Sequence, residues 1–353
     1  MPFSSSGPLQ APEYSKLIVY SEQFDIYRLE QLAIGLRASL TKLAPKVEVQ
    51  VVDFHHVEAD PGEVLSKAQG SVAYIGLRGS RGEPISPRTR EHLERLDQAR
   101  IPYRVFGDKT FTERYALNDQ VPHLIELLGG HSFRTVPVSG FEKTTYLGFD
   151  LGHPKSKRHS VPVMTVVDAR GRLLGYWRGQ QPRDETIRSG SIRAAMEWLR
   201  ENMEKLSLSN DWVVLRDGKS FKNDGMRDLF KALGAMTTYV EVIKNPVPLM
   251  HMDTKPMEPG GLAILNEGRE ALLQTEQPLV RYQIGRPIRL RLGHNPAGRS
   301  IESLAASVFS LCHAPSLGLR STRSPGPIYW ADGLAKESGK ALQFAGLHHV
   351  EHN

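Results

Sequence analysis

Apolar positions in the first part of the chain follow two different periods. Short apolar runs at 17–20, 48–54, 71–77 and 102–106 have the length of buried strands. Between the first two runs, one residue type recurs at the three- and four-residue steps of a helix face: Leu29, Leu32, Leu36, Leu40 and Leu43. Charged helices are predicted near 88–99 and 115–128, the second ending at Gly129. Strands that alternate with helices predict a parallel, Rossmann-like sheet.

The pattern changes after residues 131–143. A strand, TTYLGFDLG, is followed by a predicted hairpin of SVPVMTVVD and RLLGYWRG. Next come a helix with an apolar stripe from Ile192 to Leu206, a strand at 211–217, a helix from Met226 to Leu233 and a strand at 237–243. Three strands in hairpin order and then alternating helix and strand is the order of ribonuclease H. Two more helices are predicted near 302–313 and 329–343.

These patterns predict an α/β protein of two domains. A length of 353 residues suits that number. We expect a flexible lead at 1–14 that lacks the basic and apolar segments of a signal peptide, a Rossmann-like domain at 15–138 and a ribonuclease H-like domain at 139–353. The first strand is not followed by GxGxxG, so a dinucleotide is not indicated.

Composition bears on the location and the partners of the protein. The sequence has no run of about 18 apolar residues, so we expect no membrane span. The single cysteine, Cys312, excludes an intrachain disulfide and suits a cytoplasmic location. A net charge of +6 and a pI of about 9.3 allow a polyanionic partner without requiring one.

Two carboxylates interrupt apolar strands of the second half. Asp150 lies within TYLGFDLGH, and Asp217 ends WVVLRD. In a ribonuclease H-like sheet these strands are neighbours, and two buried carboxylates at adjacent strand ends repel unless a cation lies between them. Oxygen ligands of this kind select Mg²⁺ or Mn²⁺. The alternatives are an Asp150 paired with Arg or Lys, and an Asp217-Gly218 pair that forms a plain turn.

The second half also resembles the PIWI domain of Argonaute proteins. The resemblance lies in four motifs, in order over roughly 200 residues: GFDLGH (148–153), QQPRDETI (180–187), VVLRDGK (213–219) and LCH…STRSPGPIYWADGLA (311–335). The family's catalytic set falls on Asp150, Glu185, Asp217 and Asp332. Two alternatives stay open: Asp184 competes with Glu185, and Asp332 reads without the motif as a helix cap.

This resemblance implies a guide-directed endonuclease. Asp150, Asp217 and Asp332 would hold two Mg²⁺ or Mn²⁺ ions, and Glu185 would complete the site. The target strand of a guide–target duplex would be cut to leave a 5′-phosphate and a 3′-hydroxyl. The first half would be a MID domain that holds the 5′ end of the guide. The layout is similar to that of short prokaryotic Argonautes, which usually lack these acids, whereas this sequence has all four.

Nucleic-acid contacts follow from the same resemblance. The MID pocket of the family usually carries Tyr, Lys, Gln and Lys, and the matching positions here are Arg88, His92, Arg104 and His123. Contacts with the nucleic-acid backbone are expected from basic residues beside the motifs, at Lys155, Lys157, Arg158, Lys219, Lys222, Arg320 and Arg323.

Two other functions remain open on the sequence. The first is a catalytically silent short Argonaute that binds guide and target and acts through a partner effector in defence against invading DNA, or beside a protein that supplies a PAZ-like function. The second is a ribonuclease H-like nuclease that uses no guide.

Overall fold

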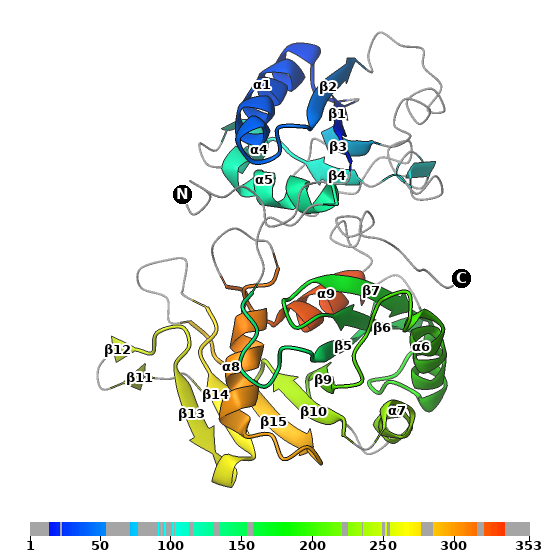
Figure 1. The fold of residues 1–353 in the computed structure, drawn as a ribbon, viewed down its shortest axis with the longest axis vertical. Coiled ribbons are helices and arrows are strands. Elements are labelled where there is room, and N and C mark those ends of the chain that lie inside the picture. Colours follow the sequence, from blue (N-terminus) through cyan, green and yellow to red (C-terminus); the bar gives the residue numbers. More distant parts are fainter. Residues whose placement is uncertain are drawn as a thin grey trace. The chain divides into compact units, whose positions relative to one another are not determined.

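The computed structural model describes residues 14–21, 23–53, 71–76, 91, 93, 95–96, 101, 103–112, 116–129, 135–153, 158–220, 225–234, 236–248, 251–252, 255–276, 285–315 and 321–335. The chain divides into two compact units (Figure 1). Described residues up to 129 lie in the first unit, and those from 135 on lie in the second. No helix in these ranges is both long and apolar enough to cross a bilayer.

The first unit is built on a parallel sheet. Its strands are β1 (Lys16–Ser21), β2 (Glu48–Asp53), β3 (Val72–Gly76) and β4 (Tyr103–Phe106), in the order β2-β1-β3-β4. Every described pairing in this sheet is parallel. The Rossmann-like sheet predicted from the sequence is therefore confirmed.

Helices cover both faces of this sheet. Helix α1 (Ile26–Leu43) begins after Asp25, whose carboxylate accepts the backbone N–H of Arg28. Its leucines pack with α5 (Ala116–Leu127) on one face of the strands. Leu93 and Leu96 pack on the other face, with Ile18 and Tyr20 of β1. A short helix, α4 (Lys109–Thr112), precedes α5.

The second unit is built on a mixed sheet. Its predicted part consists of β5 (Thr145–Gly152), β6 (His159–Val167), β7 (Leu173–Arg178), β9 (Trp212–Asp217) and β10 (Thr238–Ile243). Strands β5, β6 and β7 are antiparallel neighbours, whereas β9 and β10 run parallel to β5. The ribonuclease H-like order predicted from the sequence is confirmed. A two-residue strand, β8 (Gln181–Pro182), pairs with β6.

Three further strands extend the sheet beyond β10. These are β13 (Leu262–Leu265), β14 (Glu270–Leu273) and β15 (Ile288–His294), which give the order β13-β14-β15-β10-β9-β5-β6-β7. A 3₁₀ turn, η1 (Asn266–Gly268), joins β13 to β14. A separate pair is formed by β11 (His251–Met252) and β12 (Lys255–Pro256). The sequence pattern had left all these strands unassigned.

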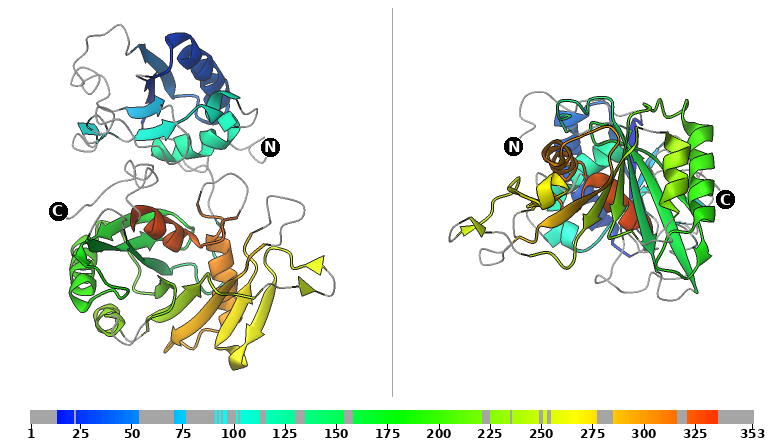
Figure 2. Two further views of the ribbon diagram at one scale, coloured as in Figure 1. Left: turned by 180° about the vertical axis from the view of Figure 1, so that it is seen from behind. Right: turned by 90° about the horizontal axis from the view of Figure 1, so that it is seen from below.

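Helices cover both faces of the second sheet as well. Helices α6 (Ser189–Asn202) and α7 (Met226–Leu233) lie on one face, and α8 (Ile301–Leu311) and α9 (Gly326–Ala335) lie on the other (Figure 2). The stripe predicted for α6 continued to Leu206, but the helix ends at Asn202, and Met203 and Leu206 pack against the same core from a turn. Helix α9 begins three residues before the predicted start.

Two glycines bring α9 against β5. A Cβ atom added to Gly148 would overlap the carbonyl group of Pro327, and one added to Gly152 would overlap that of Ala335. Gly148 and Gly152 occupy alternate positions on the same face of β5 as Asp150, which lies between them. The missing side chains therefore let the helix backbone lie directly over the strand and carry Asp332 to Asp150.

We predict that Gly148→Ala lowers the free energy of unfolding by about 2 kcal/mol or more, because the new methyl group meets backbone atoms that have little room to move. Gly190→Ala is the matched control: Gly190 lies on α6, where an added Cβ has no neighbour within 4 Å, so this change should be neutral or stabilise by up to about 1 kcal/mol. Urea unfolding of both variants checks this. Equal effects of the two changes would contradict the close packing of α9 on β5.

Candidate metal centre

The ends of three parallel strands place charged residues at one edge of the second sheet. Strand β9 lies between β5 and β10, and all three run in the same direction, so their carboxyl ends meet at the same edge. Phe149 is paired with Arg216, and one position further on the register brings Asp150 beside Asp217. Asp217 is in turn paired with Val242 of β10.

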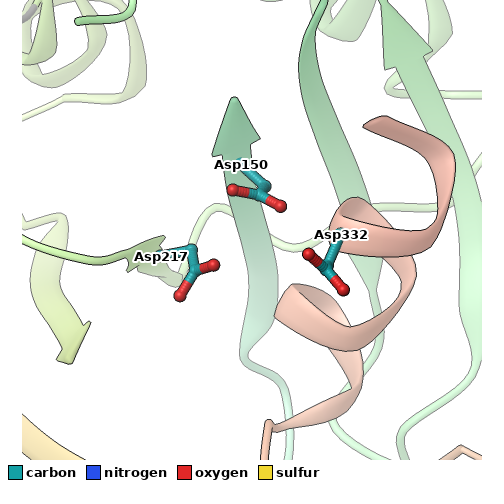
Figure 3. Close-up of side chains that lie close together, drawn as sticks. All are labelled: Asp150, Asp217 and Asp332. Atoms are coloured by element: carbon teal, nitrogen blue, oxygen red, sulfur yellow. The ribbon is translucent and has the colours of Figure 1, made fainter. Parts of the chain in front are cut away.

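The alternation of side chains along the strands turns the two aspartates to the α9 side. Leu147 and Phe149 of β5 pack into the core that contains α6 and α7, so Asp150 lies on the opposite face. Asp332, the seventh residue of α9, faces them from the helix (Figure 3). One carboxylate oxygen from each of Asp150, Asp217 and Asp332 lies within 4.8 Å of the others.

The position of Asp332 within α9 bears on whether this residue caps the helix or belongs with the other acids. A capping aspartate precedes a helix or lies in its first turn, but α9 begins at Gly326 and Asp332 lies well inside it. Asp332 therefore does not cap the helix. Its carboxylate instead faces Asp150 and Asp217, as Figure 3 shows.

The carboxylates of Asp150 and Asp217 are largely shielded from solvent. Asp150 is only 8% exposed, and its Oδ1 atom accepts the backbone N–H of Leu151 at 2.7 Å. The Oδ2 atom of Asp217 lies 2.6 Å from Nζ of Lys244. The Oδ1 atom of Asp217 is buried and has no hydrogen-bond partner in the described chain. Lys244 thus pairs with one carboxylate of the cluster, that of Asp217.

This crowding changes the acidity of Asp150. Its pKa is raised to about 7, first because burial disfavours the ionised form and second because the Asp217 carboxylate lies nearby. Asp332 acts in the same direction, while Lys244 and the N–H of Leu151 lower the pKa. The ionised site therefore favours an additional cation.

The donor atoms fit a hard divalent ion. All three side chains offer carboxylate oxygens, which are the ligands that Mg²⁺ and Mn²⁺ prefer. Softer metals such as Zn²⁺ and Cu⁺ select nitrogen or sulfur ligands instead. An ion between them would satisfy the unpartnered Oδ1 atom of Asp217 and offset the mutual repulsion of the acids. The cation suggested by the two strand-end aspartates thus has a site of suitable chemistry.

Glu185 lies outside this cluster. It belongs to the loop between β8 and α6, its side chain is 81% exposed, and its Oε2 atom is 3.5 Å from Nε2 of His153. His153 follows β5 and also contacts Ser160 through Nδ1, at 3.0 Å. The loop that carries Glu185 therefore reaches the segment just after Asp150 through a histidine, while its carboxylate faces solvent.

The loop around Glu185 is held at both ends. Gln181 donates to the carbonyl group of Thr186 and accepts from the N–H of Arg188. The hydroxyl group of Ser160 accepts the N–H of Asp184 and donates to its carbonyl group. The Asp184 carboxylate accepts from Thr186 and pairs with Arg188 at 3.2 Å. Asp184 thus stabilises the loop, and Glu185 is the acid left at its surface.

The remaining predicted residues fall in several places. Arg88, His92, Lys155, Lys157, Lys222 and Arg320 lie outside the described residues, as does the side chain of His123 on α5. Arg104 lies on β4 and its Nε atom donates to Oε1 of Gln120 at 2.9 Å. Arg158 and Lys219 are exposed. Arg323 is half-buried and donates to the carbonyl groups of Lys244 and Pro287.

Sequence reasoning missed Lys244. It directly follows the apolar strand β10, just as Asp217 ends β9, so the rule that pointed to the strand-end acids applies to this lysine as well. Its sequence signal is the same as that of the acids, a charged residue at the end of an apolar strand.

The fold is that of the MID and PIWI region of Argonaute proteins. No model of a protein family matches the sequence, and no curated protein matches it. Among solved structures, Clostridium butyricum Argonaute, bound to a guide DNA and a 19-mer target DNA, is 16% identical with a TM-score of 0.72 over 97% of this chain and 50% of its own. Drosophila Piwi is 17% identical with a TM-score of 0.72 over 98% and 50%. Argonaute of Aquifex aeolicus is 16% identical with a TM-score of 0.64 over 93% and 48%. The chain spans about half the length of these proteins.

The raised pKa of Asp150 predicts a pH dependence of stability. In the folded protein the carboxyl group of Asp150 keeps its proton up to about pH 7. In the unfolded chain the same group loses its proton near pH 4. Between these values the folded state binds more protons, so the contribution of Asp150 to the free energy of unfolding falls as the pH rises. Between pH 5 and pH 8 the wild type should lose stability relative to Asp150→Asn, by on the order of a few kcal/mol.

Urea unfolding in the presence of EDTA at pH 5, 6, 7 and 8 checks this prediction. Ionisable groups outside the centre contribute equally to both proteins, so the difference between the two proteins reports the titration of Asp150 and of the carboxylates that interact with it. Adding Mn²⁺ at pH 8 should restore the wild type and leave Asp150→Asn unchanged. A difference that is constant across the pH range would show that Asp150 ionises normally.

Proposed function

We propose that this chain binds a guide and its target and cuts the target strand as a divalent-metal-dependent endonuclease. The observation that carries the proposal is the meeting of Asp150, Asp217 and Asp332 within 4.8 Å at the strand ends of a PIWI fold. Residues 15–138 would be the MID domain that binds the 5′ end of the guide, and 139–353 would be the PIWI domain. Clostridium butyricum Argonaute, which shares the fold, was solved with guide and target DNA.

The carboxylates have separate parts in this proposal. Asp150 is the central and most buried of the three, so it would contact both of two Mg²⁺ or Mn²⁺ ions, while Asp217 and Asp332 would each hold one. When bound, the ions supply an activated water and stabilise the leaving 3′-oxygen, which yields 5′-phosphate and 3′-hydroxyl products. The protein fixes the ligands on two strands and one helix, so little rearrangement is needed to position them.

Glu185 would be the fourth acid. The loop that carries it is anchored by Gln181 and Ser160, and the Glu185 carboxylate contacts His153, three residues after Asp150. Rotation of the Glu185 side chain away from solvent would add a fourth carboxylate to the centre. Asp184 is engaged by Thr186 and Arg188, which supports Glu185 over its neighbour for this part.

Basic residues would hold the duplex by its backbone, without reading its sequence. Arg158 and Lys219 are exposed: Lys219 lies two residues after Asp217, and Arg158 directly precedes β6. Arg104, with Arg88, His92 and His123, would contact the 5′ end of the guide in the MID domain. A partner protein with a PAZ-like or effector part belongs to the same proposal.

The first test of this function is metal-dependent cutting. The purified chain, loaded with RNA or DNA guides, should cut a complementary labelled target with Mn²⁺ or Mg²⁺. Asp217→Asn should abolish cutting and leave duplex affinity unchanged or tighter, because it removes a metal ligand and one negative charge near the phosphates. Cleavage gels and filter binding measure the two properties. Duplex binding by the wild type without cutting, with every guide type and both metals, would support the silent binder instead.

The second test separates Glu185 from Asp184. Glu185→Gln should slow cleavage by about tenfold or more and leave the melting temperature unchanged, because its carboxylate is exposed in the free protein. Asp184→Asn should lower the melting temperature slightly by weakening the loop, with a smaller loss of rate. Single-turnover rates and thermal melts of both variants check this. The reverse order of the two rates would assign the fourth acid to Asp184.

A further inference from the structure

Lys244 is a positive charge built into the acidic centre. It directly follows β10, so it reaches the edge of the sheet at which β5 and β9 present Asp150 and Asp217. Its Nζ atom lies 2.6 Å from Oδ2 of Asp217, and the side chains of the two residues are only 25% and 14% exposed. A contact this short between part-buried charges is a charge-assisted hydrogen bond and not a loose surface pair.

The backbone of Lys244 is fixed by a second residue. The guanidinium group of Arg323 donates to the carbonyl group of Lys244 and, at 3.2 Å, to that of Pro287. Arg323 precedes α9 by three residues, so the helix that supplies Asp332 and the lysine that neutralises Asp217 are tied together. The position of Lys244 is thus part of the architecture of the centre.

The charge of Lys244 affects how many divalent ions the centre can bind. Lys244 already places a positive charge on Asp217, so an ion bound at the three acids meets this charge. A second ion would have to share Asp217 with the ammonium group, and two cations on one carboxylate repel each other. Only the Oδ1 atom of Asp217 lacks a hydrogen-bond partner, so a single oxygen of this residue is available to an ion.

We propose that Lys244 is a tethered cation that competes with a divalent ion for Asp217. In the free protein the centre then binds one divalent ion tightly and a second only where Lys244 is displaced from Asp217. The inference rests on the proposed function in one respect alone, that the three acids form a metal site.

The test counts bound ions in the absence of nucleic acid. The metal-free, full-length protein is titrated with Mn²⁺, and free Mn²⁺ is followed by electron paramagnetic resonance. The wild type should bind one ion tightly. Lys244→Met, which keeps the length of the side chain without its charge, should bind two, the second about tenfold or more tighter than in the wild type, as expected for the loss of one charged hydrogen bond. Lys244→Gln is a second variant if the first folds poorly.

Two controls show whether the effect is specific. Lys219→Met removes the same charge from an exposed position two residues after Asp217 and should leave the stoichiometry unchanged. In an Asp217→Asn background, Lys244→Met should no longer add an ion, because the residue through which Lys244 acts has lost its charge. A gain equal to that of Lys244→Met in the Lys219 variant, or one that persists without Asp217, would overturn the proposal.

The remaining outcomes separate this inference from the proposed function. Equal stoichiometry and affinity in the wild type and both Lys244 variants would overturn the tethered cation and leave the nuclease standing. Two ions in Lys244→Met, with no cleavage of any target by the wild type, would support the inference and overturn the nuclease. If neither the wild type nor the Lys244 variants bind Mn²⁺, the acidic cluster is not a metal site and both fail.

Discussion

Repulsion among three carboxylates in a space with little water is the constraint around which the second unit is arranged. Such a group is unfavourable unless its charges are compensated, and the ion pair of Lys244 with Asp217 is one such compensation. Collecting these acids costs stability, and a cation between them would offset that cost. Burial and, after it, the neighbouring carboxylate of Asp217 raise the pKa of Asp150. A proton held by Asp150 therefore relieves part of the repulsion.

The geometry that enforces this repulsion comes from ordinary rules of strand and helix packing. Parallel strands bring their carboxyl ends to one edge, and the alternation of side chains turns Asp150 and Asp217 to the same face. Gly148 and Gly152 remove the side chains that would keep α9 at a normal distance from β5. The glycines of the motif are therefore as necessary to the centre as its aspartate, because Asp332 reaches the other acids only through this close approach.

Local patterns in the sequence were sufficient for the parallel sheet of the first unit, for strands β5, β6, β7, β9 and β10 of the second, and for the strand-end acids, because all of these follow from the periods of apolar residues and from strand order. They failed for β15, where Arg289 and Arg291 interrupt the apolar pattern. Each arginine is neutralised by a glutamate of a neighbouring strand, Glu270 and Glu241 respectively, and such pairing depends on a register that local sequence does not contain. The same limit applies to Lys244, whose meaning depends on its distance from Asp217, and to Glu185, whose exposed position depends on the contacts of its loop.

The arrival of Asp332 on a late helix also has a consequence for the order in which the protein is made. A ribosome releases Asp150, Asp217 and Lys244 well before α9, so the growing chain can pair Lys244 with Asp217 while the third acid is still missing. Until α9 docks, the glycine face of β5 is uncovered and the ligand set is incomplete. Completion of the acidic cluster is then coupled to the docking of α9, so an unfinished chain would carry the motif of the first strand without the third acid.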